Sequence, residues 1–402
     1  MFAVLLASYV VNAMDRQLFP LLGADVRREY GFSLARIGLL ATIFTLGMAV
    51  AGIPTGYLLA RLSRKAVLQV GIAIFSAGTV LTVASRGFAD MLTYRAATGI
   101  GEAMELTALL AIAANYFSRN RAVAVGAVNF CFAAGAIIGP ILGGTLLSAY
   151  RSWRLPMILF GLLGALAMVL IAVVVKPSFT EKFSERGKAD GPRGADDRGA
   201  ASRLLNRSTV LLTVMSLIGG LVIYGYLGMY PTFLREGLHY TPRAAGAVVG
   251  LFGLGALGSL AGGWLGDRFS PRRVLGLAFV GAAALGYLLF HSSGFAVQSS
   301  LSFAWGLIVS GTIYVNLAGY QVKAVQGNLA DRASGVFVTS LYGSASFAGY
   351  LMGWMAAHAG WVAAGEIQLT ALSAAGAILA LGLRPDRTDA VGRHLLQKTL
   401  DS

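Results

Sequence analysis

The sequence GYLLARLSRK at residues 56–65 recurs 207 residues later as GWLGDRFSPRR at residues 263–273. In both places an apolar segment gives way to a cluster of basic residues. A second echo relates RAVAVG at residues 121–126 to RASG at residues 332–335, with an offset of 211 residues. Because both offsets are about half the length of the chain, the repeats predict two related halves.

The composition indicates a membrane protein. Of 402 residues, 56% are hydrophobic and 12% are charged, whereas soluble domains carry about 25% charged residues. At about 20 residues per spanning helix, this length accommodates roughly twelve spans. The 52 glycines suit close helix packing in lipid, where small residues let two backbones approach each other.

Apolar runs between charged residues, proline or glycine predict six spans in each half. The first six are residues 2–23, 33–60, 66–85, 88–117, 121–150 and 153–176. The second six are residues 208–234, 243–266, 272–291, 295–322, 333–358 and 362–383. We therefore expect an all-α membrane protein of twelve transmembrane helices in two pseudo-symmetric six-helix bundles. The first eleven residues lack the basic leader and cleavage site of a secretory signal, so they should begin the first span.

The predicted bundles are residues 1–176 and 208–384. Residues 177–207, rich in Gly, Ala, Asp, Arg and Lys, have the composition of a mobile cytoplasmic linker, and residues 385–402 should form a cytoplasmic tail. With the N-terminus in the cytoplasm, the inner loops and tail hold 22 of the 32 lysines and arginines, and the outer loops hold 8. The positive-inside rule therefore predicts an inner-membrane protein with both termini cytoplasmic.

This asymmetry also explains the net charge of +14, because the basic residues lie in loops between spans. No nucleic-acid-binding pattern accompanies them, so we expect no nucleic acid partner. The chain has no nucleotide-binding P-loop sequence, which argues against an ATP-driven pump. Its four histidines lack metal-ligand spacing. We expect neither enzymatic activity nor a metal or other cofactor.

Charged residues inside two apolar spans are the main functional signal. Asp15 and Arg16 are neighbours in the first span, where each charge costs about 2.5 to 3.5 kcal/mol on insertion scales. In the fourth span Arg95 and Glu102 are seven residues apart, two helical turns, and Glu105 follows one turn later. Charges retained at such cost predict the transport of ions or substrate.

These charges suggest a proton switch. Burial disfavours the ionised form of a carboxyl group, whereas a nearby guanidinium favours it. When a substrate carboxylate occupies Arg16 or Arg95, the neighbouring acid can hold a proton. We expect Asp15, Glu102 and Glu105 to couple protons, and Arg16 and Arg95 to bind an anion through their planar guanidinium groups. The alternative is that these residues form static ion pairs that brace the helices.

The second half carries few central charges and offers hydroxyl and amide groups instead. We expect the uncharged part of the substrate to be contacted by Asn12, Tyr224, Tyr314, Asn316, Tyr320, Tyr342 and Ser346. Tyr342, Ser346, Tyr350 and Trp354 recur every four residues and share one helix face. Such a stripe is also typical of ordinary helix packing.

The quoted motifs resemble those of the major facilitator superfamily over essentially the whole chain. Residues 56–65 and 263–273 resemble its loop signature and its second copy. The segment from Arg95 to Gly101 resembles a motif of the fourth span, and residues 135–144 resemble a glycine-proline motif prominent in proton antiporters. The resemblance implies a conformational role for Gly56, Arg61, Arg64, Gly139, Pro140, Gly263, Asp267, Arg268 and Arg272.

One position departs from the family pattern. The acid expected in the first loop signature is Ala60, whereas the second copy retains Asp267. In the family this acid caps helices and helps to latch the halves on the cytoplasmic side. The latch is therefore asymmetric in this chain, or Ala60 is a neutral change that its neighbours tolerate.

At a finer level, Asp15-Arg16 and the segment RAATGIGEA at residues 95–103 resemble two branches of the superfamily. One branch contains sialin-like anion:cation symporters, and the other contains spinster-like lipid transporters. In both, acids of the first and fourth helices are associated with proton movement while neighbouring arginines face the substrate.

The expected function is secondary active transport by alternating access: proton-coupled uptake of a small organic anion, such as a carboxylate or acidic sugar, by a monomer in the bilayer. One alternative is a proton-driven exporter of lysolipids or drug-like amphiphiles, which the glycine-proline motif and the spinster-like pair Asp15-Arg16 favour. The other is a facilitator or receptor whose charged pairs set its conformation without moving protons.

Overall fold

The computed structural model is helical throughout the residues it describes, 1–117, 121–181, 203–326 and 329–383. The helices of the first half are α1 (Phe2–Tyr30), α2 (Leu34–Thr42), α3 (Phe44–Arg61), α4 (Arg64–Val83), α5 (Phe88–Tyr116), α6 (Arg121–Tyr150), α7 (Arg154–Val174) and α8 (Pro177–Thr180). Those of the second half are α9 (Arg207–Thr232), η3 (Phe233–Gly237), α10 (Pro242–Ala256), α11 (Ser259–Arg268), α12 (Pro271–His291), α13 (Phe295–Trp305), η4 (Gly306–Tyr314), α14 (Val315–Lys323), α15 (Ala330–Gly365), η6 (Glu366–Ala371) and α16 (Leu372–Leu381).

These helices account for the expected spans. Among the described residues, ten helical segments are long and apolar enough to cross a membrane. One of them, Arg332–Leu381, is 50 residues long and contains two spans, because α15 reverses at Gly360. Gly360 has a φ of 85° and a ψ of 166°, a conformation that is essentially restricted to glycine. The charged helix α1, 29 residues long, completes the set of twelve.

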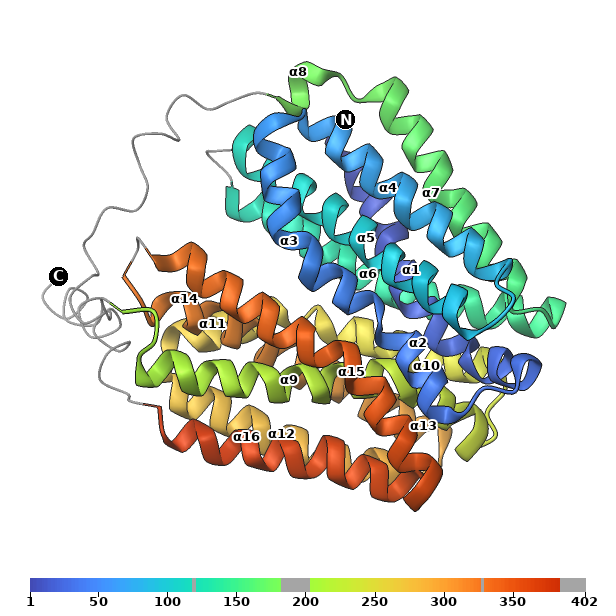
Figure 1. Cartoon of the computed structure of the whole chain (residues 1–402). Coiled ribbons are helices and arrows are strands. Elements are labelled where there is room, and N and C mark those ends of the chain that lie inside the picture. The colour runs from blue at the N-terminus through green and yellow to red at the C-terminus, as the bar shows by residue number, and fades with distance from the viewer. Residues whose placement is uncertain (118–120, 182–202, 327–328, 384–402) are drawn as a thin grey trace, which may run out of the picture.

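The helices gather into two groups, one from residues 1–181 and the other from residues 203–383 (Figure 1). The domain boundaries at 176, 207 and 384 remain predictions, since most of the expected linker and the expected tail lie outside the described residues. The first residues of the expected linker form the short helix α8, which packs on the first half. The Arg64 guanidinium donates a hydrogen bond to the Thr180 carbonyl, and the rings of Tyr116 and Phe179 lie 4.1 Å apart.

The two halves meet where α2 packs on α15 and where α6 packs on α10. A Cβ atom at Gly38 would lie 1.9 Å from the carbonyl oxygen of Gly349, so only glycine allows this approach of α2 to α15. Likewise, a Cβ at Gly246 of α10 would lie 2.2 Å from the Pro140 carbonyl oxygen of α6. Gly139, the neighbour of Pro140, faces Met14 of α1 instead. The glycine-proline segment therefore forms part of the contact between the halves.

Two ion pairs join the halves at one end of this contact, which we call the latch end. Arg235 Nη1 lies 2.9 Å from Asp25 Oδ2, and Arg27 Nη1 lies 2.9 Å from Glu236 Oε2. Each half thus supplies one cation and one anion. From the latch end the two groups of helices diverge toward α8 and α14, where the loop signatures lie (Figure 1). We call that opposite end the signature end.

At the signature end, the following contacts of the two loop signatures, among the described residues, lie within their own halves. Arg61 lies over the ring of Tyr57 at 4.2 Å, and Arg268 lies over the ring of Trp264 at 5.3 Å. Asp267 pairs with Lys323 at 2.6 Å. In the first copy, Ala60 cannot form such a pair. Its basic neighbours bind main-chain carbonyls of α7 and α8 instead, with Lys65 Nζ 2.6 Å from the Val175 oxygen.

The remaining signature positions are exposed or loosely packed. A Cβ at Gly56 would meet nothing within 4 Å, one at Gly263 would be 3.7 Å from Val315, and Arg272 is exposed.

We expect the variant Arg235→Asp to open the latch end, because it places two negative charges together where an ion pair joined the halves. The doubly exchanged variant Asp25→Arg/Arg235→Asp should restore closure. Arg154→Asp serves as the control, since it breaks an ion pair with Glu29 at the same end but within one half.

The measurement is the distance between spin labels at Ser152→Cys and Ser293→Cys, one in each half, in a Cys131→Ser background. Arg235→Asp should populate longer distances, and the double exchange should remove them. The same longer distances in Arg154→Asp would contradict a specific role for the pair between halves.

The amino-terminal end of α5 is capped by Asp90. The backbone N–H groups of Arg86, Gly87 and Met91 donate hydrogen bonds to the Asp90 carboxylate. Asp90→Ala removes the acceptor of these bonds, so the midpoint of its thermal unfolding should lie below that of the wild type. An unchanged midpoint would contradict this capping role.

Candidate substrate and proton site

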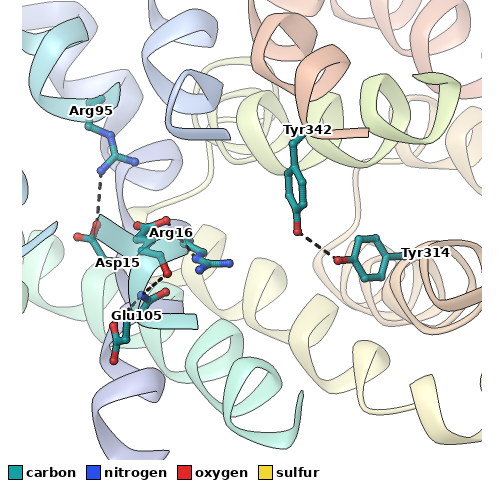
Figure 2. Close-up of polar contacts among 8 residues, drawn as sticks. Asp15, Arg16, Arg95, Glu105, Tyr314 and Tyr342 are labelled. Atoms are coloured by element: carbon teal, nitrogen blue, oxygen red, sulfur yellow. Dashed lines mark hydrogen bonds and ion pairs between the residues drawn. The ribbon is translucent and has the colours of Figure 1, made fainter. Parts of the chain in front are cut away.

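The charged residues of the first and fourth spans form two ion pairs between α1 and α5. Arg95 Nη1 lies 3.5 Å from Asp15 Oδ2, and Arg16 Nε lies 3.1 Å from Glu102 Oε2. Asp15 and Arg16 are adjacent on α1, and they thus pair with two residues that lie two turns apart on α5. Figure 2 shows the contact of Asp15 with Arg95. All four side chains are at most 5% exposed. The structure therefore brings together four of the five charges that the sequence singled out, and it pairs them across helices.

The two arginines have different surroundings. Arg95 is 0% exposed, and its guanidinium carbon lies 4.8 Å from the ring centre of Phe19 and 5.8 Å from that of Phe44. Arg16 retains 5% exposure and lies 5.9 Å from the ring centre of Tyr9. Arg95 is enclosed within the first half, where it holds Asp15, whereas Arg16 lies on the side of the cluster that faces the second half (Figure 2).

A third carboxyl group, that of Glu105, is held by neutral donors from α1. Ser8 Oγ donates to Oε1 of Glu105, and Asn12 Nδ2 donates to Oε2 at 2.8 Å. All three residues are buried. Asn12, expected from the sequence to contact the substrate, therefore orients Glu105.

The charges of this cluster do not balance. Asp15, Glu102 and Glu105 supply three carboxyl groups, against the two guanidinium groups of Arg16 and Arg95. With every group ionised, the buried cluster carries one net negative charge. An unbalanced charge is costly in a low-dielectric interior, and uptake of one proton makes the cluster neutral.

Aromatic residues of both halves line the side opposite Arg16. The hydroxyl groups of Tyr314 and Tyr342 lie 3.1 Å apart, and Figure 2 shows the Arg16 side chain directed toward this pair. The ring of Tyr224 packs edge-on against Tyr342 at 5.9 Å and lies 6.1 Å from Phe44 of the first half. A charged wall from the first half thus faces an aromatic, hydroxyl-bearing wall from the second.

Three residues expected to bind substrate have their polar groups engaged in helix packing. Asn316 Nδ2 and Tyr320 Oη donate to main-chain carbonyls of α11, those of Gly262 at 2.9 Å and Gly266 at 3.0 Å. Ser346 Oγ donates to the carbonyl of Gly343, on its own helix.

Two neighbours of the cluster escaped the sequence analysis. Ser8 lies four residues before Asn12, so the helical period of α1 could have revealed it. Thr79 of α4 is fully buried beside the Asp15 carboxyl. No spacing in the sequence relates a residue of the third span to one of the first, so only the packing of α4 identifies Thr79.

Twelve spanning helices in two groups, with buried charges inside the first group, are the architecture of a secondary transporter. The family model of the Major Facilitator Superfamily matches residues 5–350. The chain belongs to this superfamily, whose members are transporters and not enzymes.

Several relatives transport organic anions, according to their names. The chain is 26% identical over 356 residues to a gallate transporter of Pseudomonas putida, covering 82% of this chain and 76% of the relative. It is 24% identical over 333 residues to a hexuronate transporter of Bacillus subtilis, covering 80% and 78%. A solved structure of a bacterial homologue of the lysosomal transporter spinster superposes with a TM-score of 0.70 at 18% identity, covering 94% of each chain. These similarities confirm the predicted fold and superfamily, with relatives from both of the branches named above.

The crossed pairs predict a non-additive effect on stability. Asp15→Asn leaves the buried Arg95 guanidinium without its counter-charge, and we expect it to lower the free energy of unfolding by about 3 to 5 kcal/mol. The double variant Asp15→Asn/Arg95→Gln should lose less than the sum of the two single variants. The measurement is denaturant-induced unfolding of the purified protein in detergent micelles.

The control is the exposed pair of Asp267 and Lys323, whose removal should cost no more than about 1 kcal/mol. Additive losses for Asp15 and Arg95 would show that the two residues do not act as a pair.

Proposed function

We propose that the protein is a proton-coupled symporter that takes up a small organic anion, such as a carboxylate or an acidic sugar. Arg16 binds the anion, and Glu102, its ion-pair partner, carries the coupled proton. Asp15 and Glu105 set the charge of the site and exchange protons with it. Arg95 positions Asp15. The protein works as a monomer in the cell membrane, with both termini in the cytoplasm.

The observation that carries this proposal is the ion pair between Arg16 and Glu102. An anion that binds the Arg16 guanidinium competes with Glu102 for it, and Glu102 is fully buried. Losing its counter-charge, a buried carboxylate gains a proton. Without substrate, the cluster needs one proton for neutrality. A bound anion adds one more negative charge, so a further proton enters with it. Anion and proton therefore cross together.

The arrangement of the two halves supports alternating access. The latch end is held by glycine-mediated helix contacts and by two ion pairs, while the helices diverge toward the signature end. If the positive-inside rule sets the orientation, the signature end faces the cytoplasm. The structure is then the state that releases substrate inward.

The alternative function, a proton-driven exporter of lysolipids or amphiphilic drugs, drew its support from the glycine-proline segment and from the spinster-like pair Asp15-Arg16. In the structure Gly139 faces Met14 and Pro140 faces Gly246, so close helix packing accounts for this segment. The buried guanidinium of Arg16 also suits a compact anion better than an alkyl chain. These observations favour the symporter over the exporter.

Proteoliposomes test the proposal. An inward proton gradient should drive accumulation of labelled 4-hydroxybenzoate or glucuronate, and Glu102→Gln should abolish this accumulation while retaining part of the exchange of internal for external substrate. Glu29→Gln is the matched control, because it alters a half-exposed carboxyl group outside the site.

Expulsion of substrate under the same gradient would identify an exporter, and no response to the gradient would identify a facilitator or receptor. Equal loss of accumulation and exchange in Glu102→Gln would assign Glu102 a structural role.

A further inference from the structure

We infer that the anion is a hydroxylated aromatic monocarboxylate, with its carboxylate at Arg16 and its ring hydroxyl at the paired phenols of Tyr314 and Tyr342. The inference rests on the proposed function, since it takes Arg16 as the anion-binding group. It goes further by choosing one substrate class among carboxylates, acidic sugars and lipids.

The hydroxyl pair is built to bind a third hydroxyl group. Each phenol carries one donor hydrogen and can also accept a hydrogen bond. The contact between Tyr314 and Tyr342 at 3.1 Å uses one of the two hydrogens, so the other hydrogen and further acceptor positions remain. A ligand hydroxyl group can accept this remaining hydrogen and can donate its own hydrogen to a phenol oxygen. In Figure 2 the Arg16 side chain is directed toward the pair, so one ligand can reach both groups only if its carboxylate and its hydroxyl lie at opposite ends.

The walls between these two ends are aromatic. Tyr224 lies 6.1 Å from Phe44 and 5.9 Å from Tyr342, and Arg16 itself lies 5.9 Å from the ring centre of Tyr9. Such rings offer flat apolar surface and edge-on contacts to another ring. A rigid ring with polar groups at both ends matches this environment.

An acidic sugar fits less well. It carries several hydroxyl groups, each of which needs a partner when it leaves water. Asn316 and Tyr320, which could have supplied such partners, instead donate to backbone carbonyls of α11, and Ser346 donates to Gly343. An alkyl chain fits less well still, because it offers no acceptor to the hydrogen that the contact between Tyr314 and Tyr342 leaves unused.

The local backbone supports a binding role for Tyr314. This residue ends η4, the π-helical segment Gly306–Tyr314, in the middle of its span. π-Helical turns are rare and occur frequently at functional sites, because they displace side chains from the regular helix face. Arg16 belongs to the first half, and the two tyrosines belong to the second. A ligand that bridges them therefore responds to the relative movement of the halves.

The test is isothermal titration of the purified full-length protein with 4-hydroxybenzoate, benzoate and glucuronate. The wild type should bind 4-hydroxybenzoate about tenfold more tightly than benzoate, which lacks the hydroxyl group. Tyr342→Phe and Tyr314→Phe should each remove this preference by weakening the binding of 4-hydroxybenzoate, with the binding of benzoate unchanged. The control Tyr240→Phe removes a hydrogen-bonded hydroxyl group far from the site and should leave the preference intact.

The outcomes separate this inference from the proposed function. Binding of glucuronate that requires Arg16, without binding of 4-hydroxybenzoate, would overturn the substrate class and leave the anion symporter in place. Equal affinity for benzoate and 4-hydroxybenzoate in the wild type would overturn the role of the hydroxyl pair. If the protein bound none of the three anions, both the inference and the proposed function would fail.

Discussion

The structure depends on the cost of burying charge in lipid. Asp15, Arg16, Arg95 and Glu102 are almost wholly removed from water, and each is tolerated because an opposite charge on the neighbouring helix compensates it. The two ion pairs hold α1 against α5, and they also make the protonation of each carboxyl group depend on its partner. A change in the charge at one member alters the protonation that its partner favours. In the proposed function, the stability of the first half and its response to protons and anions therefore come from the same contacts.

The second half contributes in a different way. Its polar residues near the site are mostly satisfied by backbone carbonyls, as for Asn316 and Tyr320, which fixes the helices and leaves the phenols of Tyr314 and Tyr342 available. The first half therefore supplies the charged groups of the site, and the second half supplies its aromatic surface and its hydrogen-bonding hydroxyl groups. A substrate that contacts both walls then links proton binding in one half to the relative position of the two halves.

The contacts between the halves are of two kinds with different consequences. Backbone approach at Gly38 and Gly246 depends on the absence of side chains and is insensitive to charge. The ion pairs at the latch end are partly exposed, so each contributes little on its own. Such weak, separable contacts suit the opening and closing that the proposed alternating-access cycle requires of this end. The loop signatures act within their own halves in this state, and Ala60 makes their contacts unequal.

The sequence by itself determined the fold class, the number of spans and the identity of the buried charges. Hydrophobic length, the internal repeat and the cost of intramembrane charge are local or periodic properties. Tertiary structure decided the rest. That Asp15 pairs with Arg95, that Asn12 orients Glu105 and that Thr79 joins the cluster all depend on how α1, α4 and α5 pack. The sequence could not reveal these contacts, because helical periodicity gives the face of one helix and not the neighbour that the face meets.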